Sequence, residues 1–294
     1  MQLGYAVPNN HGVLDVHQLV DLAVRAERLG YRSVWVSEHL FHAAYVAKRL
    51  GDRPYWDPLT VLTAAAVATQ HIRLGTSVLV LPWHHPARLG KTIATLDHLS
   101  NGRVDLGVGV AVTEDEFANL GVPFSTRGAQ TNDALAALNA LWYQDVPEYD
   151  GRFFQFSGQR FEPKPKQHPL PIHVGGGVTA ALSRVANFGQ GWHALGKSPA
   201  ELAADLKQLA TLMAQQGRSM DELHISIRCV VEFLDQPFER PPEDRRTLRG
   251  TEEEVRQTIA AFAEAGVHEI VVDAASGDVQ ANLDTLERVM GLVS

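Results

Sequence analysis

The sequence predicts an α/β protein: a (β/α)8 barrel in a single domain over residues 1–294, with insertions after the fourth and seventh strands. Short apolar runs of β type alternate with helical segments eight times, and each run ends in Gly, Ser, His or Pro just before a helix. The predicted strands are residues 2–7, 32–37, 72–81, 103–110, 171–175, 191–196, 223–233 and 268–274. A chain of 294 residues with 45% hydrophobic content can bury one core of this size. Such barrels carry their chemistry where strands run out into helices, so those positions are the candidates.

Composition and charge exclude several classes of protein. A net charge of −8 leaves no basic stripe for nucleic acid or an anionic membrane. Cys229 is the only cysteine, which excludes an internal disulfide and a cysteine-based zinc site. The first residues lack the pattern of a signal peptide, and no apolar stretch reaches the roughly 18 residues that span a bilayer. We therefore expect a cytoplasmic protein with a small-molecule substrate and with neither a nucleic-acid nor a membrane partner.

The first half of the chain follows the alternation closely. Apolar residues at helical spacing predict a helix over 16–29, which Gly30 ends as a C-cap. The run 33–36 is typical of a parallel strand buried on both faces. A loop over 38–56 then leads to Asp57 and Pro58, a capping residue and a proline that open the next helix.

The second half carries the predicted insertions. A glycine-rich strand, 104–110, precedes an unusually long helical stretch that is interrupted at 121–123. Aromatic and polar residues alternate over 149–161, which predicts a small β insertion on the surface. Residues 235–249 mix acidic, basic and proline residues, and we interpret them as either a disordered loop or a lid.

Three successive glycines, Gly175, Gly176 and Gly177, follow the fifth predicted strand, and a helix is expected to begin near Thr179. Glycines let backbone N–H groups approach an anion, and a helix N-terminus adds partial positive charge. The loop is therefore a candidate phosphate site, with a tight turn as the alternative. Lys197 and Arg184 could complete the charge. The alternative for both is a solvated surface charge, and this is what we expect for Arg184.

Glu38 and His39 end the second strand, where a histidine faces the barrel mouth and can transfer a proton or bind a ligand. The alternative is a local role, in which His39 caps the next segment or pairs with Glu38. His39 and His42 have i, i+3 spacing, but no further ligand set accompanies them, so a catalytic metal is not expected.

Small residues end two neighbouring strands. Ser77 and Val78 follow Gly75 on the third strand, and Gly107 and Gly109 lie on the fourth. A flat ligand could lie against such a thin wall, although glycines also mark barrel bends. A lone Gly-x-Gly without the full dinucleotide fingerprint argues against a nicotinamide-binding Rossmann domain.

Several stretches together resemble the luciferase-like family of flavin and deazaflavin oxidoreductases. The resemblance covers residues 1 to about 290, and its most specific segments are 26–39, 72–82, 94–103 and the Gly175–Gly177 loop with Gly191 and Trp192. It implies a barrel, usually dimeric, that holds the cofactor ring at its C-terminal mouth. It also implies a non-proline cis peptide at Ser77–Val78, a cofactor phosphate against Gly176 and Gly177, and a proton-transferring role for His39 with Glu38 beside it.

Within this family the chain is similar to the branch that uses the deazaflavin F420. The resemblance implies hydride transfer between reduced F420 and a small organic substrate. Many relatives carry Trp or Glu where this chain has Val112, and the Glu form is the acid of sugar-phosphate dehydrogenases, so Val112 argues against that activity. The acidic residues that follow, 114–116, are expected in the first turn of the next helix, where carboxylates favour the helix dipole.

The alternatives are an FMN-dependent monooxygenase supplied by a separate reductase, a barrel that binds a flavin or deazaflavin without turnover, and a metal-dependent hydrolase. The substrate is not identified by the sequence, but residues 41–56 and 83–85 are expected to shape its pocket.

Overall fold

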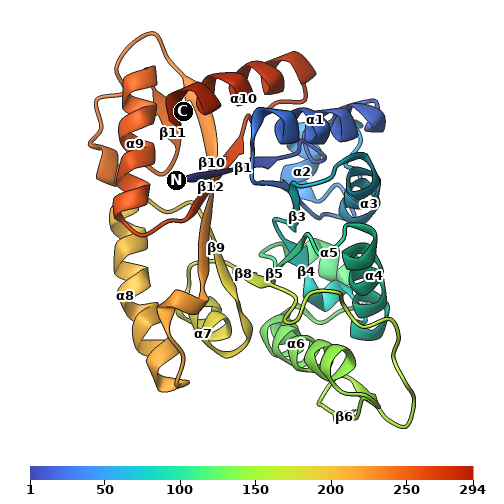
Figure 1. The fold of residues 1–294 in the computed structure, drawn as a ribbon. Coiled ribbons are helices and arrows are strands. Elements are labelled where there is room, and N and C mark those ends of the chain that lie inside the picture. Colours follow the sequence, from blue (N-terminus) through green and yellow to red (C-terminus); the bar gives the residue numbers. More distant parts are fainter. Residues whose placement is uncertain (294) are drawn as a thin grey trace.

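The computed structural model, which describes residues 1–293, is a closed barrel of parallel strands surrounded by helices (Figure 1). Within that range, eight strands pair in the order β1-β2-β3-β5-β8-β9-β10-β12, and β12 returns to β1. Every pairing around the barrel is parallel, so the predicted (β/α)8 barrel is confirmed. Its strands are β1 Gln2–Ala6, β2 Ser33–Val36, β3 Arg73–Thr76, β5 Val104–Gly109, β8 Ile172–Gly175, β9 Gly191–Leu195, β10 His224–Phe233 and β12 Glu269–Asp273.

Helices form the outer layer. They are α1 Val16–Leu29, α2 Ala44–Leu50, α3 Pro58–Ala68, α4 Pro86–Leu99, α5 Glu114–Asn119, α6 Arg127–Tyr143, α7 Thr179–Phe188, α8 Pro199–Gln215, α9 Glu252–Glu264 and α10 Val279–Val293. Short 3-10 turns lie at Leu81–Trp83, Phe124–Thr126, Met220–Glu222 and Pro242–Asp244. The predicted signals act as expected: Gly30 ends α1 with φ at 91°, and Asp57 accepts a hydrogen bond from the Thr60 N–H at the start of α3.

The third predicted strand is interrupted. β3 ends at Thr76, the Ser77–Val78 peptide is cis, and the chain resumes as the short strand β4, Leu79–Val80, against β5. The cis peptide that the resemblance implied is therefore present.

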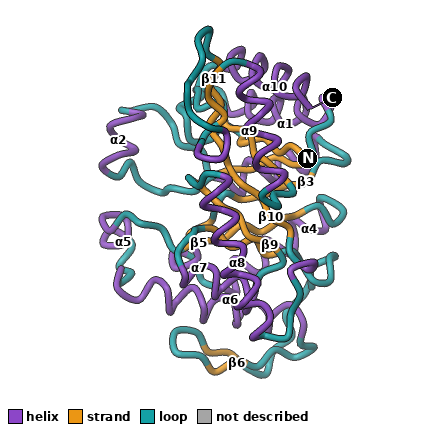
Figure 2. Tube along the Cα trace, turned by 90° about the vertical axis from the view of Figure 1, so that its left-hand side faces the viewer, coloured by secondary structure: helices purple, strands orange, loops and turns teal. Residues whose placement is uncertain are grey.

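The loop predicted over 38–56 contains the helix α2. In the side view of Figure 2, α2 and α5 project on the same side of the barrel.

Both predicted insertions have defined structure. After β5, the strands β6 Tyr149–Asp150 and β7 Gln155–Phe156 form an antiparallel hairpin. After β10, residues 235–249 lead into the parallel strand β11 Leu248–Gly250 and pack on α9. Arg245 in this segment is buried and donates hydrogen bonds to Glu254 and Thr258 of α9. The segment is held in place by these contacts, so its interpretation as a disordered loop is wrong.

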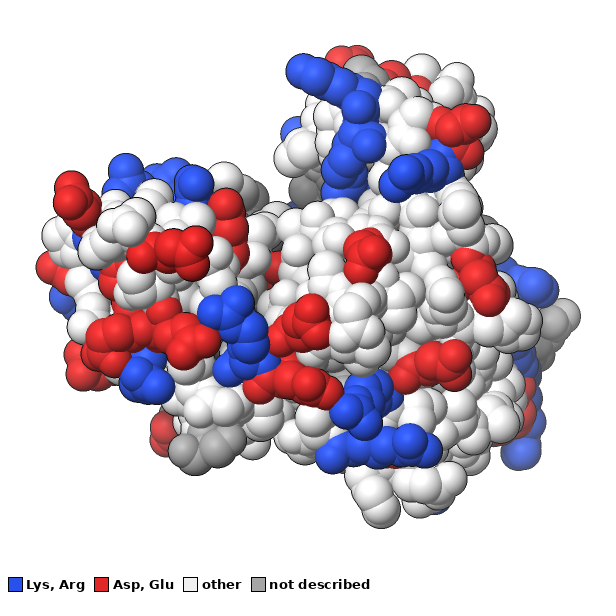
Figure 3. All heavy atoms as spheres, turned by 90° about the horizontal axis from the view of Figure 1, so that it is seen from above, with Lys and Arg blue, Asp and Glu red and all other residues white. Residues whose placement is uncertain are grey.

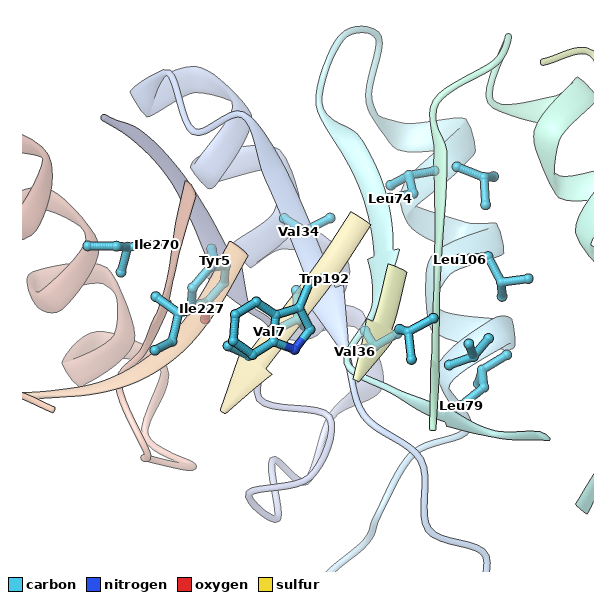
Figure 4. Close-up of a cluster of buried hydrophobic side chains, with 14 of the residues drawn as sticks. Tyr5, Val7, Val34, Val36, Leu74, Leu79, Leu106, Trp192, Ile227 and Ile270 are labelled. Carbon is cyan, nitrogen blue, oxygen red and sulfur yellow. The ribbon is translucent and has the colours of Figure 1, made fainter. Parts of the chain in front are cut away.

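Most of the apolar core lies between the strands and the helices. Figure 4 shows this layer, with Val34, Val36, Leu74, Leu106 and Ile270 among its members. The buried Arg184 also belongs outside the barrel, where it donates a hydrogen bond of 2.7 Å to Asn132 on α6. Our expectation that Arg184 is a solvated surface charge is therefore wrong: its guanidinium links α7 to α6.

The barrel interior is polar and aromatic. Because strand side chains alternate between the two faces, Ser33 and Trp35 of β2 point inward while Val34 and Val36 point outward. At the N-terminal end, Asp105 and Glu269 pair with Arg73 and Arg32 at 2.6 and 2.8 Å. This charged layer closes the bottom of the barrel and leaves the C-terminal end for the candidate site.

Candidate functional site

The end of β2 and the bulge at Ser77–Val78, which follows β3, form one rim of the barrel mouth. The buried Glu38 carboxylate accepts hydrogen bonds from the Val80 N–H at 2.7 Å and from His84 Nε2 at 2.8 Å. Burial alone would lower the pKa of His84, but the hydrogen bond to Glu38 outweighs it and raises that pKa. Glu38 therefore fixes the chain that follows the Ser77–Val78 bulge, and the alternative in which His39 pairs with Glu38 is wrong.

His39 instead pairs with Glu116 from α5. Its Nδ1 atom lies 2.5 Å from Glu116 Oε2, and its Nε2 atom is hydrogen-bonded to the Tyr45 hydroxyl on α2. The rings of Tyr45, Tyr55 and Trp83 pack edge-on around the imidazole, with centroids 5.3, 5.6 and 6.1 Å away. The imidazole is thus held at both nitrogens and enclosed by aromatic rings.

The sequence did not identify Glu116 as part of the site. The structure confirms its expected place in the first turn of α5, and its buried side chain accepts a 3.3 Å hydrogen bond from the hydroxyl of Thr113, the residue that precedes the helix. Its other oxygen accepts the N–H groups of Leu40 and Phe41 at 3.0 and 3.2 Å. Burial alone would raise the pKa of the Glu116 carboxyl, but these bonds and the His39 bond lower it. Glu116 is therefore a carboxylate acceptor, and His39 Nδ1 donates to it.

Beneath the rim, His193 of β9 forms the floor. Its Nε2 atom lies 2.8 Å from Ser77 Oγ and its Nδ1 atom 2.8 Å from Ser226 Oγ. The ring stacks on Trp35 at 4.6 Å with 15° between the planes. Burial lowers the pKa of His193 to about 3, and the positive charge of nearby Arg228 acts in the same direction. A neutral imidazole therefore holds the Ser77 side chain in place.

The opposite side of the mouth is charged. Arg228 of β10 forms an ion pair of 2.8 Å with Asp273 and donates a 2.6 Å hydrogen bond to Ser37 Oγ. Burial alone would raise the pKa of the Asp273 carboxyl, but the charge of Arg228 lowers it. The sequence offered one signal for this network: His224, Ser226 and Arg228 alternate with apolar residues along one strand, which places all three on the inner face.

A cavity of 410 Å³ opens beside this network. It is lined by Asn10, His11, Arg49, Leu50, Arg53, Arg228, Val230, Asp273, Ala275 and Gly277. Basic side chains also gather on the lobe that projects from the body in Figure 3. The excess of arginine over carboxylate at this cavity favours an anionic ligand group.

The predicted thin wall is occupied by Val78. A Cβ atom on Gly109 or Gly175 would lie 2.7 or 3.0 Å from the Val78 methyl groups, and one on Gly107 would lie 1.7 Å from the Thr76 carbonyl oxygen. These glycines therefore make room for the bulge, and Val78 is the side chain that stands over them. Their contact with a cofactor stays a prediction.

The Gly175–Gly177 loop lies beside Lys197. Gly176 adopts a φ of 103° and its carbonyl accepts a 2.6 Å hydrogen bond from Trp192 Nε1. A Cβ atom on Gly177 would lie 3.2 Å from Lys197 Nζ, and Lys197 forms an ion pair of 2.8 Å with Asp205. The helix α7 begins here at Thr179 with no side-chain cap on its N–H groups. The structure thus brings the glycine loop, a helix N-terminus and an ammonium group together.

Two further features bear on the class of site. Among residues 1–293, no cluster of three or more His, Cys, Asp or Glu side chains is arranged to hold a metal ion. No helix in the described part of the chain is both long enough and apolar enough to cross a membrane.

Comparison with known sequences identifies relatives. A family model described as luciferase-like monooxygenase matches residues 1–237. An uncharacterized protein of Mycobacterium tuberculosis is 36% identical over 207 residues, which cover 66% of this chain and 72% of that protein. An F420-dependent glucose-6-phosphate dehydrogenase of Amycolatopsis mediterranei is 31% identical over 191 residues, or 64% of this chain and 56% of that enzyme.

Solved structures share the fold. A monooxygenase from Streptomyces bottropensis superposes with a TM-score of 0.85 at 23% identity, covering 99% of this chain and 98% of that one. An F420-dependent secondary alcohol dehydrogenase, bound to an F420–acetone adduct, superposes with a TM-score of 0.83 at 18% identity and covers 100% of this chain and 99% of its own. At these identities the similarity demonstrates a common barrel.

Proposed function

The chain belongs to the luciferase-like monooxygenase family, and we propose that it is an F420-dependent oxidoreductase. In this proposal it transfers a hydride between the deazaflavin and a small organic substrate, and His39 assists the accompanying proton transfer. The observation that carries the proposal is the fixed imidazole on the rim, bonded at Nδ1 to Glu116 and adjacent in sequence to Glu38, which bonds the Val80 N–H just after the Ser77–Val78 bulge.

The residues at the mouth fit such a cofactor. The N–H groups at the start of α7, the glycine loop and Lys197 form a cradle for a phosphate, which the loop's close approach to Lys197 Nζ supports. Val78 stands over the glycine wall, where it would support one face of a flat ring. When bound, a deazaflavin or flavin supplies a two-electron hydride donor or acceptor.

The protein's own part is to orient the reactants, exclude water and move a proton. The aromatic rings around His39 shield the imidazole from solvent, and Glu116 fixes its orientation. His193 positions Ser77 beneath the bulge. His39 then assists, from its Nε2 side, the transfer of the proton that accompanies the hydride.

The F420-dependent relative from Amycolatopsis mediterranei supports F420 as the cofactor. The arginine-lined cavity also suits an acidic cofactor tail or an anionic substrate group. The second candidate is an FMN-dependent monooxygenase, because a monooxygenase from Streptomyces bottropensis has the same fold. In that case we propose a separate reductase as the source of reduced FMN. For either cofactor we propose a homodimer, which light scattering after size-exclusion chromatography tests.

The deciding experiment is a pair of equilibrium titrations of the purified protein with F420 and with FMN, followed by quenching of tryptophan fluorescence. We expect much tighter binding of F420, and then turnover of reduced F420 with a panel of carbonyl and activated alkene substrates. Preference for FMN, with oxygen consumption driven by reduced FMN, would replace the proposal with the monooxygenase.

Two further outcomes would also refute it. Tight F420 binding without turnover on the whole panel would indicate a cofactor-binding barrel. Binding of neither cofactor would refute the cofactor assignment and leave only the fold.

A further inference from the structure

We propose that Tyr45 is a catalytic residue, and that its hydroxyl, rather than His39, exchanges the proton with a substrate hydroxyl or carbonyl oxygen. This inference rests on the proposed hydride transfer and assigns its substrate class, an alcohol and the corresponding carbonyl compound. The sequence placed Tyr45 only among pocket-lining residues; its partner and its position come from the structure.

The hydrogen bonds of His39 fix its tautomer. Glu116 is a carboxylate whose pKa is lowered, so it can only accept, and His39 Nδ1 must donate to it. In the neutral imidazole, Nε2 then carries a lone pair and accepts the Tyr45 O–H. Glu116 thus sets the direction of both hydrogen bonds, although it lies 77 residues from His39 in the sequence.

Tyr45 is more accessible to a substrate than the His39 imidazole. The Nε2 lone pair of His39 is occupied by Tyr45, and the tyrosine, edgewise-packed rings and Glu116 surround the imidazole. Tyr45 itself is 47% exposed on α2, which projects at the mouth (Figure 2). A substrate oxygen therefore meets the phenol before it meets the imidazole.

Tyr45 and His39 together account for the proton that an alcohol loses on oxidation. In alcohol oxidation, the substrate O–H proton passes to the Tyr45 oxygen while the Tyr45 proton passes to His39 Nε2. A bound, oxidised deazaflavin or flavin would supply the acceptor for the electron pair of the substrate C–H bond, which would leave as hydride as the carbonyl forms. His39 becomes an imidazolium ion beside the Glu116 carboxylate, which stabilises it. Reduction of a carbonyl runs through the same steps in reverse.

Burial and the negative charge of Glu116 raise the pKa of Tyr45, so the phenol is protonated at neutral pH. It can therefore relay a proton without first forming a phenolate. Glu116 does not reach the substrate in this arrangement and is a positioning residue.

The test compares Tyr45→Phe with the wild-type protein by two measurements. In long-range ¹H–¹⁵N correlation spectra of the cofactor-free protein, we expect His39 to carry its proton on Nδ1. Tyr45→Phe should shift the Nε2 resonance and leave the tautomer unchanged, whereas Glu116→Gln should leave Tyr45 in place but weaken the preference for the Nδ1–H form.

The second measurement is turnover with a panel of secondary alcohols and ketones. We expect Tyr45→Phe to lower kcat by about 100- to 1,000-fold, the usual contribution of a general acid or base, with an unchanged Kd for the cofactor. The matched control is Tyr149→Phe. Tyr149 lies in the hairpin β6–β7, and its hydroxyl donates to Asp133 of α6, so the variant should behave as wild type in turnover.

The possible failures are distinguishable. If the wild type turns over these substrates and the kcat of Tyr45→Phe is within threefold of the wild-type kcat, the relay is refuted and hydride transfer remains. A His39 proton found on Nε2 would refute the relay as well. No turnover of any alcohol or ketone by the wild type with either cofactor would refute the proposed substrate class, whatever the spectra show.

Discussion

Replacement of Lys197 by Met tests the phosphate cradle at the Gly175–Gly177 loop. The Lys197 ammonium lies 3.2 Å from the position of a Cβ on Gly177, so a phosphate bound at this loop would lie about 4 Å from the charge. At that separation, two unit charges attract by about 4 kcal/mol if the effective dielectric constant is about 20. The side chains of Lys197 and Asp205 are 25% and 19% exposed, so salt and the existing ion pair reduce this attraction.

We therefore expect Lys197→Met to weaken F420 binding by about 1–2 kcal/mol, which raises Kd about 5- to 30-fold. Asp205→Asn should act in the opposite direction, because it frees the ammonium from its carboxylate partner. The assay is titration calorimetry with F420 at low salt and again at high salt, where the difference between variants should shrink.

The matched control is Lys166→Met. It removes the same charge from a lysine that is bonded to Asn101, in the turn that precedes β5 at the opposite end of the barrel. If Lys197→Met and Lys166→Met have the same Kd within twofold, and Asp205→Asn has no effect, the cradle does not bind the cofactor phosphate.

Three further predictions concern stability. Arg103→Ala should lower the free energy of unfolding by about 3–5 kcal/mol, because backbone carbonyls at and after the end of α3 lose the buried guanidinium that donates to them. Urea unfolding measures this loss, with Arg256→Ala, at an exposed arginine, as the control. Gly107→Ala should yield little folded protein, because its Cβ would lie 1.7 Å from a carbonyl oxygen, whereas Gly291→Ala, with open space in α10, should keep or raise Tm in thermal melts. Burial lowers the pKa of His193 to about 3, so below pH of about 6.5 the unfolded chain binds a proton that the folded chain does not. The free energy of unfolding should thus fall from pH 6.5 towards 3 by up to about 1.4 kcal/mol per pH unit. His193→Gln should flatten that part of the curve. A variant whose urea midpoint depends on pH as the wild-type midpoint does would contradict the prediction.

The fold was predictable because its signals are local. The helix over 16–29 and its end at Gly30 are encoded by apolar spacing and one left-handed residue. Asp57 and Pro58 mark the start of α3 in the same way. The cis peptide at Ser77–Val78 followed from family resemblance rather than from any local signal.

The errors have physical reasons as well. Arg184 was expected at the surface because charged residues usually lie there, yet Asn132 on a neighbouring helix accepts its hydrogen bond. Residues 235–249 resemble a disordered segment in composition, but the buried Arg245 and the Phe238 N–H both bond Glu254 and hold them on α9. In both cases hydrogen bonds to a neighbouring helix outweighed the local tendency.

The sequence by itself determined the order of strands and helices, the ends of most elements, and the rim on which His39 lies. These follow from periodicity and capping, which act over a few residues. Only the tertiary structure decided that Glu38 bonds His84, that Glu116 holds His39, and that Tyr45 covers its other nitrogen. Each of these contacts joins loops at separate strand ends, and barrel closure brings such loops together, a long-range event that no local pattern records.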